Sequence, residues 1–252
     1  MITFFRRLRK TLIGEGNVRK YLLYAIGEIL LVVIGILIAL QVNNWNEERK
    51  MGSEEVRILN ILKTDLESAV EEGEEFLRLD SISVEPLKMF LVEPDWVFRL
   101  NGEGKADSLI TFSIFRVVTD VPVIQVREDI KNSGSSSSIS SQEIRNKLVE
   151  LDNKLELLEF RIADKMTVQQ TRVDEVLFKY FNLQKMVKER VTNKPHEDEW
   201  SVDLFEVLAD REATNILSLK LTISKSVFES RRQLQQTLKE LIILIEQELH
   251  IL

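Results

Sequence analysis

The sequence predicts an all-α protein in which an N-terminal transmembrane helix continues into an extracytoplasmic antiparallel helical bundle with long, coiled-coil-like helices. Three observations predict this fold class. Residues 22–42 form an almost uninterrupted apolar run. Residues 135–194 and 196–252 contain neither glycine nor proline, which favours helix. Three stretches repeat apolar residues at alternating spacings of three and four.

The apolar run is long enough to cross a bilayer once. At 1.5 Å per residue it makes about 30 Å of helix, the thickness of the hydrocarbon core. Tyr21, Tyr24 and Trp45 lie at its two ends, where aromatic rings favour the headgroup region. The alternative is a cleaved signal peptide, which has a shorter apolar core followed by small residues at the cleavage site. Here the sequence QVNNW follows at residues 41–45, so we expect an uncleaved anchor over residues 21–44.

The distribution of charge predicts the orientation of this anchor. Residues 1–20 contain six basic residues and one acidic residue, whereas residues 43–252 contain 28 basic and 39 acidic residues. The positive-inside rule therefore predicts a cytoplasmic N-terminus. We expect a bacterial inner-membrane protein with a basic cytoplasmic segment at residues 1–20 and a periplasmic helical bundle domain at residues 45–252.

The basic N-terminal segment is also amphipathic, because its apolar residues share one helical face. Such a helix lies on an anionic membrane leaflet. Nucleic acid is the alternative partner of a basic tail, and we do not expect it because this tail is tethered to a membrane. The predicted membrane-interface residues are Phe4, Phe5, Arg6, Arg7, Arg9, Lys10, Tyr21, Tyr24 and Trp45.

One acidic residue, Glu28, lies within the predicted span, about 9 Å inside its boundary. A charge at this depth is costly, so such residues usually have a partner. Glu28 belongs to a stripe of mostly small residues that lets helix backbones approach closely. This predicts a face that packs on another membrane helix; the alternative is a Glu28 that snorkels to the interface and a stripe that arises by chance. The predicted packing residues are Ala25, Glu28, Val32, Gly35 and Ala39.

The three seams of alternating spacing predict long amphipathic helices. Each seam is short for an isolated coiled coil, so packing against one another in one bundle explains them better. Whether they pair within one chain or between chains stays open. The seams are Leu59, Leu62, Leu66, Ala69, Gly73, Phe76; Ile144, Leu148, Leu151, Leu155, Leu158, Ile162; and Val227, Arg231, Leu234, Leu238, Leu241, Ile245, in which Arg231 is a polar exception.

The region 81–133 is less regular, because it collects most of the proline and glycine that follows the anchor. We expect the first helix to end near Leu79 and short helices to follow. Residues 109–118 suit a strand by composition, and a helix by the spacing of their apolar residues. Ser140 or Ser141 is expected to cap the next long helix.

The anchor region, YAIGEILLVVIGILIALQVNNWN at residues 24–46, resembles an uncharacterised family of single-pass bacterial membrane proteins that is described as a domain of unknown function. The segments REDIKNSG at 127–134 and IRNKL at 144–148 resemble its second signature. The chain departs from that pattern after Gly134, where four serines replace an apolar-polar stretch. The resemblance implies an anchored helical domain outside the cytoplasm, without catalytic residues or an established activity.

The composition argues against several classes of function. The chain has no cysteine and two histidines, which leaves little for thiol chemistry or for histidine-based metal sites. No phosphate-binding loop or nucleophile motif occurs, so we expect no enzyme, no cofactor and no metal. The expected partners are the lipid bilayer and another protein or a second copy of this chain. We therefore expect an interaction or scaffold protein. The alternative is a ligand-sensing module that acts through a separate signalling partner, with a ligand that the residues do not identify.

Overall fold

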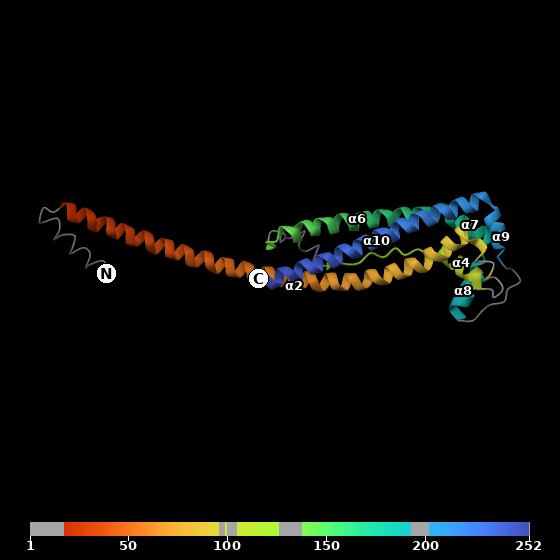
Figure 1. Cartoon of the computed structure of the whole chain (residues 1–252), viewed down its shortest axis with the longest axis horizontal. Coiled ribbons are helices and arrows are strands. Elements are labelled where there is room, and N and C mark those ends of the chain that lie inside the picture. Colours follow the sequence, from red (N-terminus) through yellow and green to blue (C-terminus); the bar gives the residue numbers. More distant parts are fainter. Residues whose placement is uncertain (1–17, 96–98, 100–104, 126–137, 193–201, 252) are drawn as a thin grey trace. The chain divides into compact units, whose positions relative to one another are not determined.

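The computed structural model describes residues 18–95, 99, 105–125, 138–192 and 202–251. This part of the chain is mainly helical and contains no strand, which confirms the all-α prediction. The chain divides into two compact units, residues 1–56 and 57–252. The principal elements are α2 (Val18–Val92), α4 (Lys105–Phe115), α6 (Gln142–Val168), the π-helix η2 (Gln169–Val173), α7 (Asp174–Tyr180), α8 (Leu183–Thr192), α9 (Leu204–Ala209) and α10 (Arg211–Ile251) (Figure 1).

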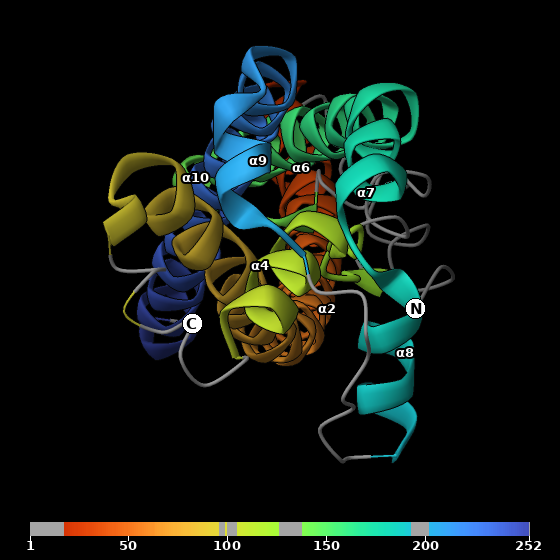
Figure 2. The same cartoon turned by 90° about the vertical axis from the view of Figure 1, so that its right-hand side faces the viewer.

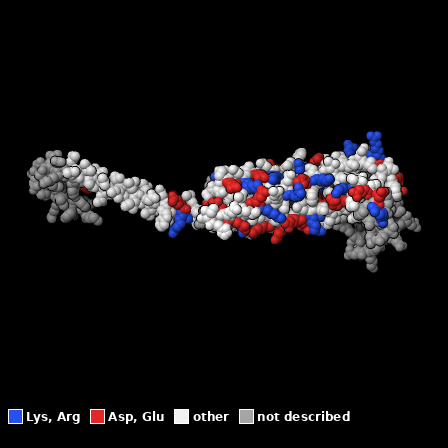
Figure 3. All heavy atoms as spheres, viewed as in Figure 1, with Lys and Arg blue, Asp and Glu red and all other residues white. Residues whose placement is uncertain are grey.

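In the first unit, the described chain is the N-terminal part of α2. Its apolar side chains are exposed along the whole predicted span; Leu31, for example, is 73% exposed. This segment is largely uncharged in Figure 3. By length and composition, this is one helix of the described chain that could cross a membrane. Exposed leucine, isoleucine and valine at this density need an apolar environment.

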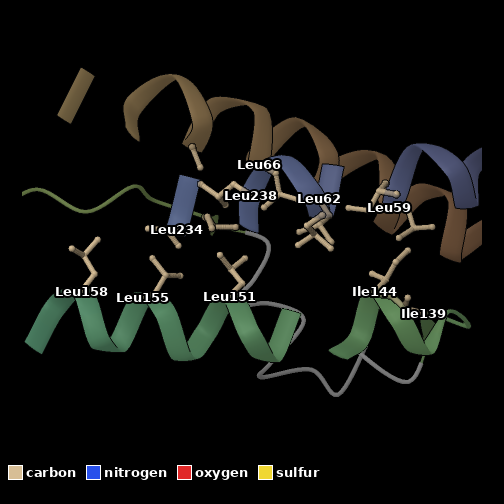
Figure 4. Close-up of a cluster of buried hydrophobic side chains, with 14 of the residues drawn as sticks. Leu59, Leu62, Leu66, Ile139, Ile144, Leu151, Leu155, Leu158, Leu234 and Leu238 are labelled. Atoms are coloured by element: carbon tan, nitrogen blue, oxygen red, sulfur yellow. The ribbon is translucent and has the colours of Figure 1, made fainter. Parts of the chain in front are cut away.

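In the second unit, α2, α6 and α10 pack on a common core made by the predicted seams. Figure 4 shows leucines of the three helices pointing toward one another. The side chains of Leu62, Leu151 and Leu238 are fully buried. Leu59, Leu66, Ala69, Leu158, Leu241 and Ile245 are fully buried as well, and Ile144, Leu155, Ile162 and Leu234 nearly so. The seams therefore pair within one chain.

The contacts between these helices give their directions. Gln235 Nε2 donates to the carbonyl of Val70 at 2.7 Å, and Lys63 Nζ lies 2.6 Å from Glu246 Oε1, so α10 runs antiparallel to α2. Lys147 Nζ lies 2.5 Å from Glu240 Oε2, and Arg161 Nη1 donates to the carbonyl of Ser226 at 3.0 Å, so α10 is antiparallel to α6 too. It follows that α2 and α6 run parallel, as two of three helices must when the third is antiparallel to both.

A parallel pair needs a connection that returns along the bundle, and residues 116–124 supply it. This strap is non-helical and follows α4. Its residues Val118 and Ile124 are buried, and the backbone N–H of Val123 donates to Glu72 Oε2 at 3.3 Å. The helical prediction for residues 109–118 is thus right up to Phe115 and wrong beyond it. Ser141 caps α6 by accepting from the Ile144 N–H at 3.5 Å.

The helix α2 continues to Val92, well past the predicted end at Leu79. It includes Pro86, which has no N–H and so removes one helical hydrogen bond. Burial of Leu87 and Phe90, which are at most 1% exposed, offsets that loss. These two residues join a second apolar cluster with α4, η2, α7, α9 and the start of α10. The helices that build this end of the unit are seen in Figure 2.

Candidate functional site

The predicted membrane stripe lies on α2, where spacings of three and four place its residues along one face. Ala25 and Glu28 are half-buried, whereas Val32, Gly35 and Ala39 are exposed. A Cβ added at Gly35 would meet no atom within 4 Å. The stripe is therefore an open helical surface from Val32 to Ala39 in this chain.

The predicted membrane-interface residues are placed only in part. Trp45 belongs to α2 and is 64% exposed. Tyr21 and Tyr24 also belong to α2, on either side of Leu22 and Leu23. Phe4, Phe5, Arg6, Arg7, Arg9 and Lys10 lie outside the described residues.

The helical domain holds a buried ionic cluster between its two apolar cores. Asp80 of α2 is fully buried, and it faces two cations. Lys165 Nζ of α6 lies 3.2 Å from Asp80 Oδ1, and Arg231 Nε of α10 lies 2.9 Å from Asp80 Oδ2. The second contact lacks the alignment of a hydrogen bond. One carboxylate thus joins the three long helices of the bundle at one level.

Arg231 also holds the strap. Its guanidinium donates to the carbonyl of Asp120 at 2.6 Å and to that of Val118 at 3.3 Å. It lies over the ring of Phe76, 5.2 Å from the centroid. A planar guanidinium has several donors and a flat face, so it can bind two carbonyls and stack on a ring at the same time. Arg231 therefore connects α10, α2 and the strap.

A second polar network surrounds the π-helix η2. The wider turn of a π-helix is often found at functional sites. Gln169, which is buried, donates through Nε2 to Asp174 Oδ1 at 2.8 Å and accepts from Lys220 Nζ. The pKa of Lys220 is lowered to about 7, mainly by burial and also by the nearby charge of Lys165, while Asp174 opposes the shift. Lys220 is thus an amine whose charge changes near neutral pH.

A pocket of about 520 Å³ lies beside this network. Its walls come from α4, the strap, α6, η2 and α7, and they combine aromatic, aliphatic and polar side chains. Arg116 and Asp174 bring opposite charges to it, and Gln169 connects it to Lys220. Pockets of this size between helices accommodate small ligands. The described residues offer no cluster of histidines and carboxylates that could hold a metal ion.

Asp210 also has a shifted pKa, and its structural contacts explain the shift. Asp210 caps α10 by accepting from the N–H groups of Glu212 and Ala213 at 2.8 and 3.2 Å. Its carboxylate also accepts from Tyr180, and Lys179 Nζ lies 3.0 Å away. Hydrogen bonds from Tyr180 and Lys179 hold the pKa of Asp210 far below its usual range. These contacts join α7 to α10 and need no catalytic role.

A family model described as "Family of unknown function (DUF6090)" matches residues 28–92. The match supports the relation to an uncharacterised family that the anchor motif implied. It covers the stripe from Glu28 onward, and also Asp80. No curated protein and no solved structure matches the chain.

Proposed function

We propose that this chain is a membrane-anchored interaction protein. In this proposal residues 21–44 cross a bacterial inner membrane once, residues 1–20 lie in the cytoplasm and residues 45–252 form a periplasmic domain. The long exposed apolar segment of α2 and the basic segment before it support this topology.

The observation that carries the proposal is the open stripe on α2. Lipid covers leucine and isoleucine well, but it leaves a groove unfilled at Gly35 and Ala39. A second transmembrane helix fills this groove, because its backbone can approach the small residues closely. The bound partner is a helix of a second copy or of another membrane protein.

The periplasmic domain would then be carried to its partners by the anchor. Val149 and Phe160 on α6 are 61% and 72% exposed, and their spacing puts them on one helix face. Both signs of charge are interspersed on the face of the domain that Figure 3 shows.

The proposal is tested by comparing two glycines of the same helix. A Cβ at Gly27 or at Gly35 meets nothing within 4 Å, so the two positions are equally open within the chain. Gly35 lies in the stripe, whereas Gly27 lies about 100° away from Glu28 around the helix. Gly35→Leu should weaken association of full-length protein in lipid vesicles, measured by energy transfer between labelled copies, and Gly27→Leu should not.

Association between copies is the first arm of this test, and cross-linking in native membranes is the second. Energy transfer that falls only with Gly35→Leu indicates a self-complex. A cross-linked foreign protein that is lost only with Gly35→Leu indicates a hetero-complex. Equal behaviour of the two variants in both arms would refute the role of the stripe.

A further inference from the structure

We propose that the pocket beside η2 binds the zwitterion of a free α-amino acid with an apolar side chain. This inference goes beyond the proposed function, because it concerns the helical domain and not the membrane stripe. A failure of either proposal leaves the other standing.

Arg116 is the group that would bind the carboxylate. Its guanidinium lies over the ring of Phe112, 5.2 Å from the centroid, and both residues line the pocket. A guanidinium stacked on an aromatic ring keeps its planar donors available for a bidentate carboxylate. Glu75, whose pKa Arg78 and also Arg116 lower, is bound by Arg78 at 2.6 and 2.7 Å.

Asp174 is the group that would bind the ammonium. Its Oδ1 accepts from Gln169 Nε2 at 2.8 Å, which fixes the orientation of the carboxylate. A carboxylate accepts several donors, so Oδ2 can take the ammonium of a ligand. With Arg116 on one wall and Asp174 on another, the pocket presents one charge of each sign. Such a pair fits a zwitterion better than a simple anion or cation.

The remaining walls suit an apolar side chain. Phe112, Phe115 and Met166 line the pocket next to the charged groups. Its volume of about 520 Å³ suits a small molecule and is too small for a folded partner. The π-helix connects this pocket to the buried core, because Gln169 lines it and also accepts from Lys220.

The test is thermal unfolding of the full-length protein in lipid nanodiscs with L-leucine or L-phenylalanine at millimolar concentration. We expect a saturable rise in Tm. Phenylalanine amide lacks the carboxylate and N-acetylphenylalanine lacks the ammonium, so each should bind at least about tenfold more weakly. These two compounds test the proposal on the unchanged protein.

Two variants and a matched control complete the experiment. Arg116→Gln and Asp174→Asn should each weaken binding at least about tenfold. Arg172→Gln changes an exposed arginine of the same π-helix that does not line this pocket, and it should bind as the parent does. The proposal is overturned if neither amino acid gives a saturable shift, or if phenylalanine amide or N-acetylphenylalanine binds as tightly as phenylalanine. Equal losses of binding in Arg172→Gln and Arg116→Gln would overturn it too.

Discussion

Arg231 Nε lies 2.9 Å from Asp80 Oδ2, and the two side chains are 2% and 0% exposed. Their residues are far apart in sequence and come from antiparallel helices. Around this pair the bundle changes from its first apolar core to its second. Buried ion pairs add little net stability, but they are costly to break. We therefore interpret the pair as fixing the register of α10 against α2.

The first prediction concerns Asp80. Asp80→Asn removes the negative charge and leaves Lys165 and Arg231 buried as unpaired cations. We expect the free energy of unfolding to fall by about 3–5 kcal/mol. Urea denaturation followed by far-UV circular dichroism measures the loss.

The matching control replaces the whole cluster. In the triple variant Asp80→Leu, Lys165→Met, Arg231→Met no buried charge is left without a partner. It should recover most of the free energy of unfolding lost in Asp80→Asn. The recovery is incomplete because the hydrogen bonds from Arg231 to the strap are lost. A triple variant no more stable than the single one would show that the ion pairs themselves stabilise the bundle.

The second prediction compares two glycines of α2. A Cβ at Gly73 would lie 2.4 Å from Gln235 Oε1, whereas one at Gly52 would meet nothing within 4 Å. Both alanine variants gain helix propensity. Gly73→Ala must also displace the Gln235 side chain and its hydrogen bond to Val70. Gly73→Ala should therefore be about 1–2 kcal/mol less stable than Gly52→Ala by thermal unfolding.

Equal stability of these two variants would mean that the Gln235 side chain has no fixed place. The double variant Gly73→Ala, Gln235→Ala separates the causes, because it removes the side chain that must move. Its loss in free energy of unfolding should be smaller than the sum of the losses in the two single variants.

The third prediction concerns pH. The pKa of Lys220 is lowered by burial from 10.5 to about 7, so between these values the folded chain binds fewer protons than the unfolded chain. The free energy of unfolding should therefore rise with pH across this window, by up to about 1.4 kcal/mol per pH unit from Lys220. Below about pH 7 both states are protonated and this slope disappears.

Lys220→Met isolates this contribution. Burial also lowers the pKa of Lys165, which gives a slope of the same sign, but Lys165 is present in both proteins. Lys63 and Lys147 have pKa values raised by hydrogen bonds to Glu246 and Glu240, and their contributions are lost only above 10.5. Denaturation between about pH 7 and pH 10 should give a flatter curve for Lys220→Met. Parallel curves would contradict the assignment.

The fourth prediction concerns topology. The chain has no cysteine, so single cysteines can be introduced without further changes. In spheroplasts of a bacterial host, a membrane-impermeant maleimide should label Lys225→Cys, an exposed position on α10. It should label Lys10→Cys only after permeabilisation. The reverse pattern would place the domain in the cytoplasm.

The seams predicted most of the domain because apolar burial dominates its packing. Ile144, Leu151, Leu155 and Leu158 all point into the first core, as their spacing indicates. The direction of α6 was not predictable from spacing. It depends on the strap, in which Val118, Pro122 and Ile124 are buried by tertiary contacts and not by a local pattern.

The predicted seams end too early, because their spacing continues into the residues of the polar cluster. Extending the second seam by steps of three and four reaches Lys165 and Gln169; extending the third backward from Val227 reaches Ser224 and Lys220. Extending the first from Phe76 reaches Asp80. The single polar exception, Arg231, was thus one of several. Periodicity gave the positions of these residues, but not which charges pair across helices.

The pocket beside η2 was hidden from the sequence for a different reason. Its walls come from several separate elements, including the strap, and no motif marks a π-helix at Gln169–Val173. The stripe on the anchor, by contrast, depends on helical spacing within one segment, and α2 provides that helix.

The most direct measurement is site-specific photocross-linking in intact membranes from two positions of α2. Val32 lies in the stripe, and Leu37 lies on the opposite face of the same helix. With a benzophenone amino acid at position 32, we predict one discrete protein adduct, identified by mass spectrometry as a second copy or one other protein and lost in Gly35→Leu. Position 37 should give no protein adduct. The same pattern from both positions, or no protein adduct from position 32, would contradict a helix-packing anchor.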